Sequence, residues 1–173
     1  ILELGPDRVA AFIGEPIMGA IGVYIPPMTY WPEIERICRK YDVLLVADEV
    51  ICGFGRTGEM WGSTSLGIKP DTITMAKAIT SAYMPLGAVT VSEPVYEALV
   101  DESKKLGVFA HGFTYSGHPV AAAVANKTLE IYERINIVAM VQRVAPVFKA
   151  RLDKLREHPL VGETRGLGLI GGV

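Results

Sequence analysis

The sequence predicts an α/β fold with a mostly parallel sheet that is covered by helices on both faces. Short apolar runs that suit strands alternate along the chain with longer segments whose apolar residues recur every three or four positions. The strand-type runs are apolar at nearly every position, which is typical of strands buried on both faces. Together these patterns favour strand–helix units over an all-helical or all-strand domain.

Each element is expected where its local pattern is clearest. Strands are predicted at 9–14, 44–47, 71–76, 87–91 and 165–173, and helices at 29–41, 93–101, 119–134 and 136–157. In the first helix, Pro32 suits the first turn and Glu33 suits the positive end of the helix dipole. Asn136 is a candidate cap for the last helix, and Pro146 is expected to bend that helix.

The composition excludes several classes of protein. Half of the 173 residues are hydrophobic and the formal net charge is −2, which argues against disorder, nucleic-acid binding and an anionic membrane partner. The stretch at 106–126 lacks Asp, Glu, Lys and Arg, but its histidines, glycines and proline make it a poor membrane span. The apolar content exceeds the needs of a small solitary domain, so we expect this chain either to oligomerise over a large area or to be part of a larger protein.

Cysteine and histidine usage argues against disulfides and metals. Cys38 and Cys52 form no Cys-x-x-Cys pair, so a reducing compartment, the cytoplasm, is the default prediction. The three histidines show no paired spacing, and no metal site is therefore expected.

Asp48 is a candidate ligand-binding residue, because open α/β sheets bind ligands at the carboxyl ends of their strands. It follows the apolar run Leu-Leu-Val-Ala, and strand alternation would put Val50 on the same side. An acid beside an apolar side chain suits a flat heteroaromatic ring, with Asp48 on a ring nitrogen and Val50 against the ring face. From the residues alone, a metal-binding Asp, a capping Asp or a plain strand end stays open.

Lys77 is a candidate nucleophile. It follows the strand expected at 71–76 and has small and apolar neighbours in the sequence. Desolvation in such surroundings would lower the pKa of the amine and make it reactive. The plainer alternative is a surface lysine whose aliphatic stem covers apolar neighbours.

Two glycine-bearing loops have compositions that could suit phosphate. The loop at 53–58 matches Gly-x-Gly-x-x-Gly in letters, but no apolar helix follows directly. A tight loop with Arg56 at its tip is therefore favoured over a dinucleotide site. The loop at 111–119 is rich in hydroxyls and glycine just before a helix, which suits a phosphate. An ordinary capping loop, with Thr114 or Ser116 bonded to backbone N–H groups, explains it equally well.

Several segments in a fixed order resemble the class III aminotransferases, which are pyridoxal-phosphate enzymes of fold type I. The segment at 47–58, Ala-Asp-Glu-Val-Ile-Cys-Gly-Phe-Gly-Arg-Thr-Gly, looks like the family signature. Met-Ala-Lys-Ala-Ile then puts Lys77 where the family has its Schiff-base lysine. The remaining matches are Glu-Pro-Ile-Met-Gly at 15–19, Tyr-Met-Pro-Leu-Gly-Ala at 83–88, Gly-Phe-Thr-Tyr-Ser-Gly-His-Pro at 112–119 and Arg-Gly-Leu-Gly at 165–168. Tyr-Trp-Pro-Glu at 30–33 and Thr-Tyr-Ser-Gly-His-Pro at 114–119 most resemble the omega-amino acid:pyruvate transaminases within this family.

The resemblance implies a domain division and roles for individual residues. Residues 1–135 would form part of the large, cofactor-binding domain, and 136–173 would begin the α+β small domain. Lys77 would hold pyridoxal phosphate as a Schiff base and, once released, carry a proton between substrate and cofactor. Asp48 would keep the pyridine nitrogen protonated, Val50 would pack on the ring, and Glu15 would lie near the site. Thr114 would bond the cofactor phosphate of the partner subunit in a homodimer with shared active sites.

The activity implied is transamination from an amine or omega-amino acid donor to a 2-oxo acid such as pyruvate. The family's main phosphate-binding turn and its substrate-binding arginine have no counterpart among these residues, so the chain alone is expected to be inactive. Aminomutase, decarboxylase and racemase chemistry use the same lysine and aspartate and stay as alternatives. A nucleotide-binding α/β domain that uses the loop at 53–58 is the alternative from a different class.

Overall fold

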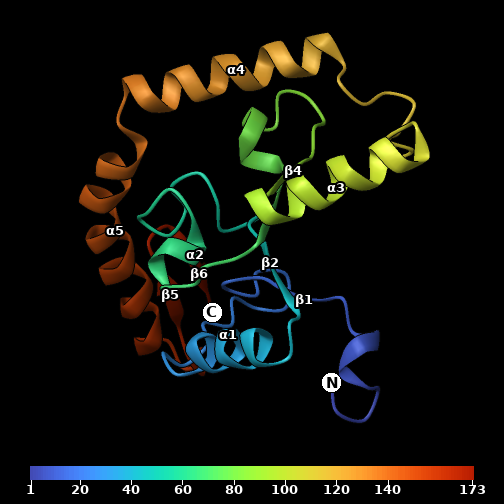
Figure 1. Cartoon of the computed structure of the whole chain (residues 1–173). Helices are drawn as coiled ribbons and strands as arrows, with labels where there is room; N and C mark the ends of the chain where they lie inside the picture. Colours follow the sequence, from blue (N-terminus) through green and yellow to red (C-terminus); the bar gives the residue numbers. More distant parts are fainter.

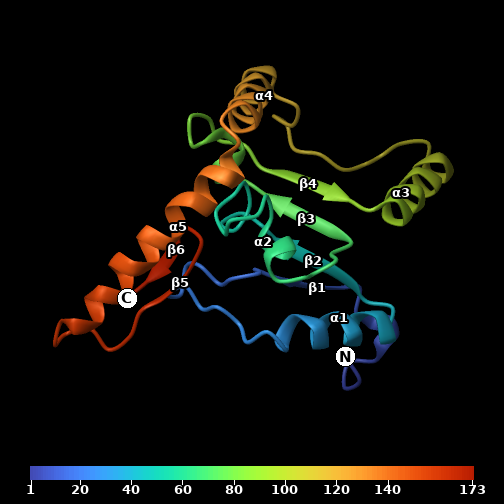
Figure 2. The ribbon, with the colours of Figure 1, turned by 90° about the vertical axis from the view of Figure 1, so that its left-hand side faces the viewer.

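A four-stranded sheet forms the centre of the computed structural model, which describes all residues from 1 to 173. The strand order is β1-β2-β3-β4, with the first three strands parallel and the last one antiparallel. The strands are β1 (Ala11–Gly14), β2 (Leu44–Asp48), β3 (Thr72–Met75) and β4 (Ala88–Val91). The prediction of a mostly parallel sheet is confirmed, and Figure 2 shows the strands stacked in this order.

Helices connect and flank these strands. They are α1 (Tyr30–Lys40), α2 (Gly62–Ser65), α3 (Glu93–Leu106), α4 (Pro119–Arg134) and α5 (Ile137–Lys154), with 3-10 turns at Pro6–Arg8, Lys77–Thr80 and Leu155–Glu157. Helix α1 packs against β2, whereas α4 packs against the 3-10 turn that follows β3. Figure 1 shows α4 crossing one end of the molecule before the chain turns sharply into α5.

Helix α3 is longer than the sequence predicted. The expected end was at 101, but the helix continues to Leu106, and Gly107 ends it in the left-handed conformation with a φ of 75°. The charged run at its end stays helical because ion pairs bridge successive turns, between Lys104 and Asp101 and between Lys105 and Glu102.

Helix α5 begins at Ile137, directly after its predicted cap Asn136. The Asn136 side-chain oxygen accepts a hydrogen bond from the Ala139 N–H at 3.3 Å, which satisfies one of the unpaired donors of the first turn. Pro146 lies inside α5 and does not end it. The helix packs against the C-terminal hairpin rather than against the central sheet.

The C-terminal segment is this hairpin, and the prediction of a single strand at 165–173 is wrong. Strands β5 (Arg165–Leu167) and β6 (Ile170–Gly172) pair antiparallel in a separate two-stranded sheet. Gly168 makes the turn with a φ of 60°, and a Cβ atom there would lie 2.5 Å from the Arg56 carbonyl oxygen. The hairpin turn therefore packs closely against the loop that contains Arg56, which is distant in the sequence. The local apolar pattern does not reveal such packing.

The buried apolar residues form two separate hydrophobic cores. The larger core joins α1, β2, the loop after β1 and the C-terminal hairpin through Ile17, Val23, Trp31, Cys38, Val43, Leu45, Cys52, Leu66, Ile68 and Ile170. The smaller core joins the loop at 53–58 to β3 and α4 through Phe54, Met75, Ile79 and Ala125. Only 28 of the 173 residues are buried, so much apolar surface is open to contact with further protein.

The helices, the cysteines and the metal-ligating residue types give three further findings. None of the helices combines the length and apolar character needed to cross a membrane. Cys38 and Cys52 are both buried and unpaired, and burial raises the pKa of the Cys52 thiol to about 12. No group of three or more His, Cys, Asp or Glu side chains converges as a metal site would require.

Candidate active site

The carboxyl ends of β1, β2 and β3 bring three of the predicted site residues to one edge of the sheet. In the strand register, Gly14 pairs with Ala47, and Asp48 pairs with Thr74. Glu15 follows β1 directly, Asp48 is the last residue of β2, and Lys77 begins the 3-10 turn just after β3. This edge is the position that carboxyl-end reasoning predicted for a ligand site.

Asp48 has one restrained and one free carboxylate oxygen. Its Oδ1 accepts a hydrogen bond from the Val50 N–H at 3.0 Å, and the carboxylate makes no ion pair. Strand β2 ends at Asp48, so Val50 lies in the turn after the strand. The predicted alternation of strand side chains therefore does not determine the position of Val50. The free oxygen is available to accept a hydrogen bond from a ligand.

Lys77 is exposed and has no hydrogen-bond or ionic partner for its amine. Within this chain the amine is exposed, as the alternative of a surface lysine predicts. The residue adopts a left-handed backbone conformation with a φ of 47°, and Ser81 and Ala82 shortly after it also have positive φ values. Left-handed backbone at non-glycine residues is costly and gathers at functional sites.

A cavity of about 320 Å³ connects Lys77 with Val50. Its lining residues are Val50, Ile51, Arg56, Lys77, Ala78, Ser81, Ala82 and Tyr132. The Tyr132 hydroxyl donates to the Ala78 carbonyl at 2.8 Å, which ties α4 to the turn that carries Lys77. The sequence pattern missed Ile51, Tyr132 and the role of Arg56 in this lining, because contacts between distant segments create it.

Glu15 lies at the same sheet edge but faces a different cavity. Its Oε2 accepts a hydrogen bond from the Gly19 N–H at 2.9 Å, so the side chain turns toward the loop that follows β1. There it lines a mostly apolar cavity of about 390 Å³ together with Tyr24 and Trp31.

Thr114 does not join the other predicted residues. It lies in the exposed segment between α3 and α4 and does not line the cavity of Lys77. Next to it, the Ser116 hydroxyl accepts a hydrogen bond from the Phe113 N–H at 3.0 Å. The ordinary turn-capping interpretation therefore holds for Ser116 within this chain.

The glycine loop at 53–58 leads into a helix start that is already occupied. Helix α2 is four residues long, and its Gly62 and Ser63 N–H groups donate to the Glu49 carboxylate at 2.8 and 2.7 Å. Phosphate binding in dinucleotide folds requires such N–H groups to be free at the start of a longer helix. The geometry therefore argues against the nucleotide-binding alternative. The sequence analysis gave Glu49 no role, although a second acidic residue directly after the apolar strand, next to Asp48, was a signal.

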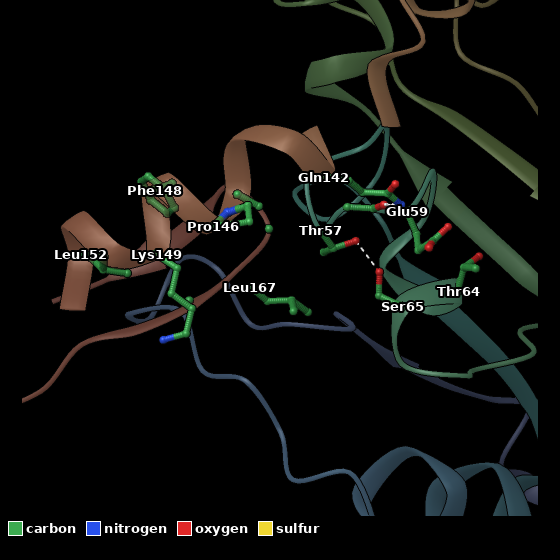
Figure 3. Close-up of a pocket in the computed structure, with 14 residues that line it drawn as sticks. Thr57, Glu59, Thr64, Ser65, Gln142, Pro146, Phe148, Lys149, Leu152 and Leu167 are labelled. Atoms are coloured by element: carbon green, nitrogen blue, oxygen red, sulfur yellow. Dashed lines mark hydrogen bonds between the residues drawn. The ribbon is translucent and has the colours of Figure 1, made fainter. Parts of the chain in front are cut away.

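A larger cavity, of about 790 Å³, lies elsewhere and contains none of the predicted site residues. Figure 3 shows it between α5 and the segment at 57–65, which includes α2; in this segment the Thr57 and Ser65 hydroxyls lie 2.6 Å apart. It brings no nucleophile together with a base, so its size alone does not make it a reaction site.

The match to a family model extends over residues 1–173, and the chain belongs to the family described as aminotransferase class-III. Gamma aminobutyrate transaminase 3, chloroplastic, of Solanum lycopersicum is 53% identical over 99% of this chain. Vanillin aminotransferase of Capsicum chinense is 51% identical over 98% of it. The chain spans 33% and 37% of the length of these two relatives.

Solved transaminases share the fold. A structure described as a transaminase with L-Ala matches with a TM-score of 0.95 and 50% identity, over 99% of this chain and 40% of that one. The omega transaminase from Pseudomonas jessenii in complex with PMP also gives a TM-score of 0.95, with 51% identity over 99% of this chain and 38% of that one. The predicted class and fold are thus confirmed: the chain is a class III aminotransferase sequence with a transaminase fold.

Proposed function

We propose that this segment works within a longer chain as part of a pyridoxal-phosphate-dependent transaminase, through Lys77. The donor would be an amine or omega-amino acid, and the acceptor a 2-oxo acid such as pyruvate. The observation that carries the proposal is the unpartnered Lys77 amine at the same sheet edge as the free Asp48 oxygen. Family membership and the PMP complex of the Pseudomonas jessenii enzyme support it.

The residues present fit this cofactor chemically. An amine without a partner can bond to the cofactor aldehyde, and a carboxylate oxygen without a partner can accept from the protonated ring nitrogen. Val50 lines the Lys77 cavity and adds an apolar surface for the face of the ring. When bound, pyridoxal phosphate supplies an electron sink for the charge that develops at the substrate carbon.

The chain's own residues then have distinct tasks. Lys77 would hold the cofactor through its amine, and the same amine, when free, would move a proton from the substrate carbon. Asp48 holds the proton on the ring nitrogen, and Val50 keeps water from the ring face. Over the full reaction the amine-bearing carbon of the donor would become a carbonyl, and the carbonyl carbon of the acceptor would receive the amino group.

Thr114 and Glu15 complete the proposed site from other directions. Thr114 lies in an exposed segment with Phe113 and Tyr115, which are 81% and 83% exposed. Exposed aromatic side chains of this kind are typical of contact surfaces, which supports a homodimer in which Thr114 bonds the partner subunit's cofactor phosphate. Glu15 would lie near the site at the same sheet edge, with its carboxylate turned toward the Gly19 N–H.

We also propose the domain division at 135/136. The support is that α5 packs against β5, and that β5 and β6 pair in a two-stranded sheet of their own rather than as strands of the central sheet. Aminomutase, decarboxylase and racemase chemistry stay as alternatives that use the same lysine and aspartate. The cytoplasmic location stays a prediction, since the related tomato enzymes include forms described as chloroplastic and mitochondrial.

Borohydride reduction tests the proposal in the full-length protein loaded with pyridoxal phosphate. Reduction should fix the cofactor to Lys77, as seen by mass spectrometry of the derived peptides, and consumption of pyruvate should accompany loss of the amine donor. Labelling at another lysine would refute the assignment, and turnover of the amine without consumption of any 2-oxo acid would refute transamination. The isolated 173-residue chain should show little or no turnover.

A further inference from the structure

Glu49 is a buried carboxylate next to the proposed cofactor-binding residues. Its side chain is 0% exposed, and no lysine, arginine or histidine pairs with it. Its Oε1 accepts from the Ser63 N–H at 2.7 Å, and its Oε2 accepts from the Gly62 N–H at 2.8 Å. A buried charge needs such partners, because an unpaired carboxylate in the interior is strongly disfavoured.

The backbone of Glu49 is held as firmly as its side chain. Its N–H donates to the Thr74 carbonyl in β3 at 2.9 Å, and its carbonyl accepts from the Gly53 N–H at 2.9 Å. One residue therefore links β3, the glycine loop and the start of α2. Its two chain neighbours are Asp48 and Val50, so any displacement of Glu49 displaces both.

The helix start is shaped to receive this carboxylate. A Cβ atom on Gly62 would lie 2.5 Å from the Cys52 Cβ and 3.2 Å from the Glu49 Oε2. Only glycine lets the Gly62 N–H approach so closely, since any larger residue would collide with the buried Cys52. The segment after the glycine loop is thus built around the side chain of Glu49.

We propose that Glu49 is a positioning residue that sets the place of the Asp48 carboxylate against the ring nitrogen of the cofactor; this inference rests on the proposed function. The two N–H bonds pull the turn at 48–50 onto α2, while the bond to Thr74 aligns it with the strand that leads to Lys77. The restrained turn then directs the free Asp48 oxygen into the site.

The carboxylate of Glu49 is needed for both hydrogen bonds to the start of α2. A carboxylate accepts both N–H bonds, whereas a glutamine in its place offers one acceptor and turns its own NH₂ group against the second donor. Bonds to an ionised group are also stronger than neutral ones. An aspartate keeps the charge but is too short to reach both donors.

A plain stabilising role as the cap of α2 predicts different behaviour. A cap that only stabilises the fold would lower the thermal midpoint on substitution and weaken the binding of every cofactor analogue alike. A residue that acts through Asp48 has its main effect on the interaction with the ring nitrogen. An analogue of pyridoxal phosphate with carbon in place of that nitrogen separates the two.

The test uses the full-length holoenzyme and its Glu49→Gln and Glu49→Asp variants. The dissociation constants of pyridoxal phosphate and of the deaza analogue are measured by absorbance, together with the thermal midpoint of the apoenzyme. In Glu49→Gln we expect affinity for pyridoxal phosphate to fall about tenfold or more, while affinity for the analogue changes by less than about threefold. If Glu49→Gln does not fold, the milder Glu49→Asp variant is measured instead. Its loss of affinity for pyridoxal phosphate is compared with its loss of affinity for the deaza analogue in the same way.

Asp71→Asn is the matched control, because Asp71 holds the other end of the same strand. Its Oδ2 accepts from the Leu45 N–H at 2.8 Å, and its carboxylate pairs with Arg39. This variant should lower the thermal midpoint without changing either dissociation constant. Equal weakening of both ligands in the Glu49 variants, or no weakening, would overturn the inference. Failure of the wild-type protein to bind pyridoxal phosphate at all would instead overturn the proposed function.

Discussion

Asp48 and Thr74 are register partners in the parallel strands β2 and β3. Because Thr74 lies in the strand that leads directly into Lys77, this pairing brings the carboxylate and the amine to one edge of the sheet. The proposed reaction depends on both groups, and the hydrogen bonds of a parallel strand pair determine their common position.

Replacement of Lys77 by arginine should abolish transamination in the full-length protein. Arginine keeps the positive charge, but its guanidinium cannot form the covalent bond to the cofactor or act as a base near neutral pH. We expect the rate to fall by about 10²-fold or more, measured as pyruvate-dependent loss of the amine donor. Lys69→Arg, at another exposed lysine, is the control, and a Lys77→Arg enzyme with wild-type turnover would contradict the assignment.

Replacement of Asp48 by asparagine should weaken cofactor binding while leaving the turn in place. The asparagine oxygen can still accept from the Val50 N–H, which Asp48 binds at 3.0 Å, but the negative charge is lost. Loss of a charge-assisted bond predicts a drop in affinity of roughly tenfold to a hundredfold, measured by absorbance titration with pyridoxal phosphate. Asp7→Asn, an exposed aspartate elsewhere, should bind normally, and unchanged affinity in Asp48→Asn would rule out the proposed contact.

Arg165 should contribute strongly to stability. Its Nε and Nη2 donate to the Gly22 carbonyl at 3.1 and 2.7 Å, and its guanidinium lies 5.0 Å from the centre of the Tyr24 ring. Arg165→Met should lower the free energy of unfolding by about 2 kcal/mol, from lost hydrogen bonds and the lost cation–π contact. Denaturant titration measures this, and Arg143→Met, at an exposed arginine of α5, should change it little.

Gly168 should not tolerate a side chain. A Cβ atom there would lie 2.5 Å from the Arg56 carbonyl oxygen, and the φ of 60° disfavours other residues. Gly168→Ala should therefore destabilise the protein by about 1–3 kcal/mol, detected by thermal unfolding. Gly162→Ala, where nothing lies within 4 Å of the added atom, is the matched control. Equal stability of the two variants would contradict the observed packing of the hairpin turn.

Cys52 should resist thiol reagents until the protein unfolds. Burial, the largest cause, raises the pKa of its thiol to about 12, from the ordinary value of 9.0, so the reactive thiolate is scarce at pH 8. The folded state keeps a proton that the unfolded chain loses near pH 9.0, and this group therefore lowers stability as the pH rises above that value. Mass spectrometry after alkylation at pH 8 checks the prediction; rapid modification of Cys52 in folded protein would refute it.

Several features could be predicted from local patterns alone. The parallel strands follow from apolar runs, the start of α5 follows from Asn136, and Asp48 and Lys77 stand out as polar residues at strand ends. Each of these signals lies within a few residues of the feature that it predicts. The motifs at 47–58 and 75–79 added the class of enzyme, which the family match confirms.

The amino-acid sequence by itself determined the fold class, the enzyme family and the two residues on which the proposed chemistry depends. Only the tertiary structure decided that Val50 reaches the site through a turn, that Lys77 is exposed, and that the C-terminal segment folds back as a hairpin. It also decided that Glu49 binds the start of α2 and that Arg56 and Tyr132 line the Lys77 cavity. The physical reason is that these features depend on hydrogen bonds and packing between segments far apart in the chain, which local periodicity does not encode.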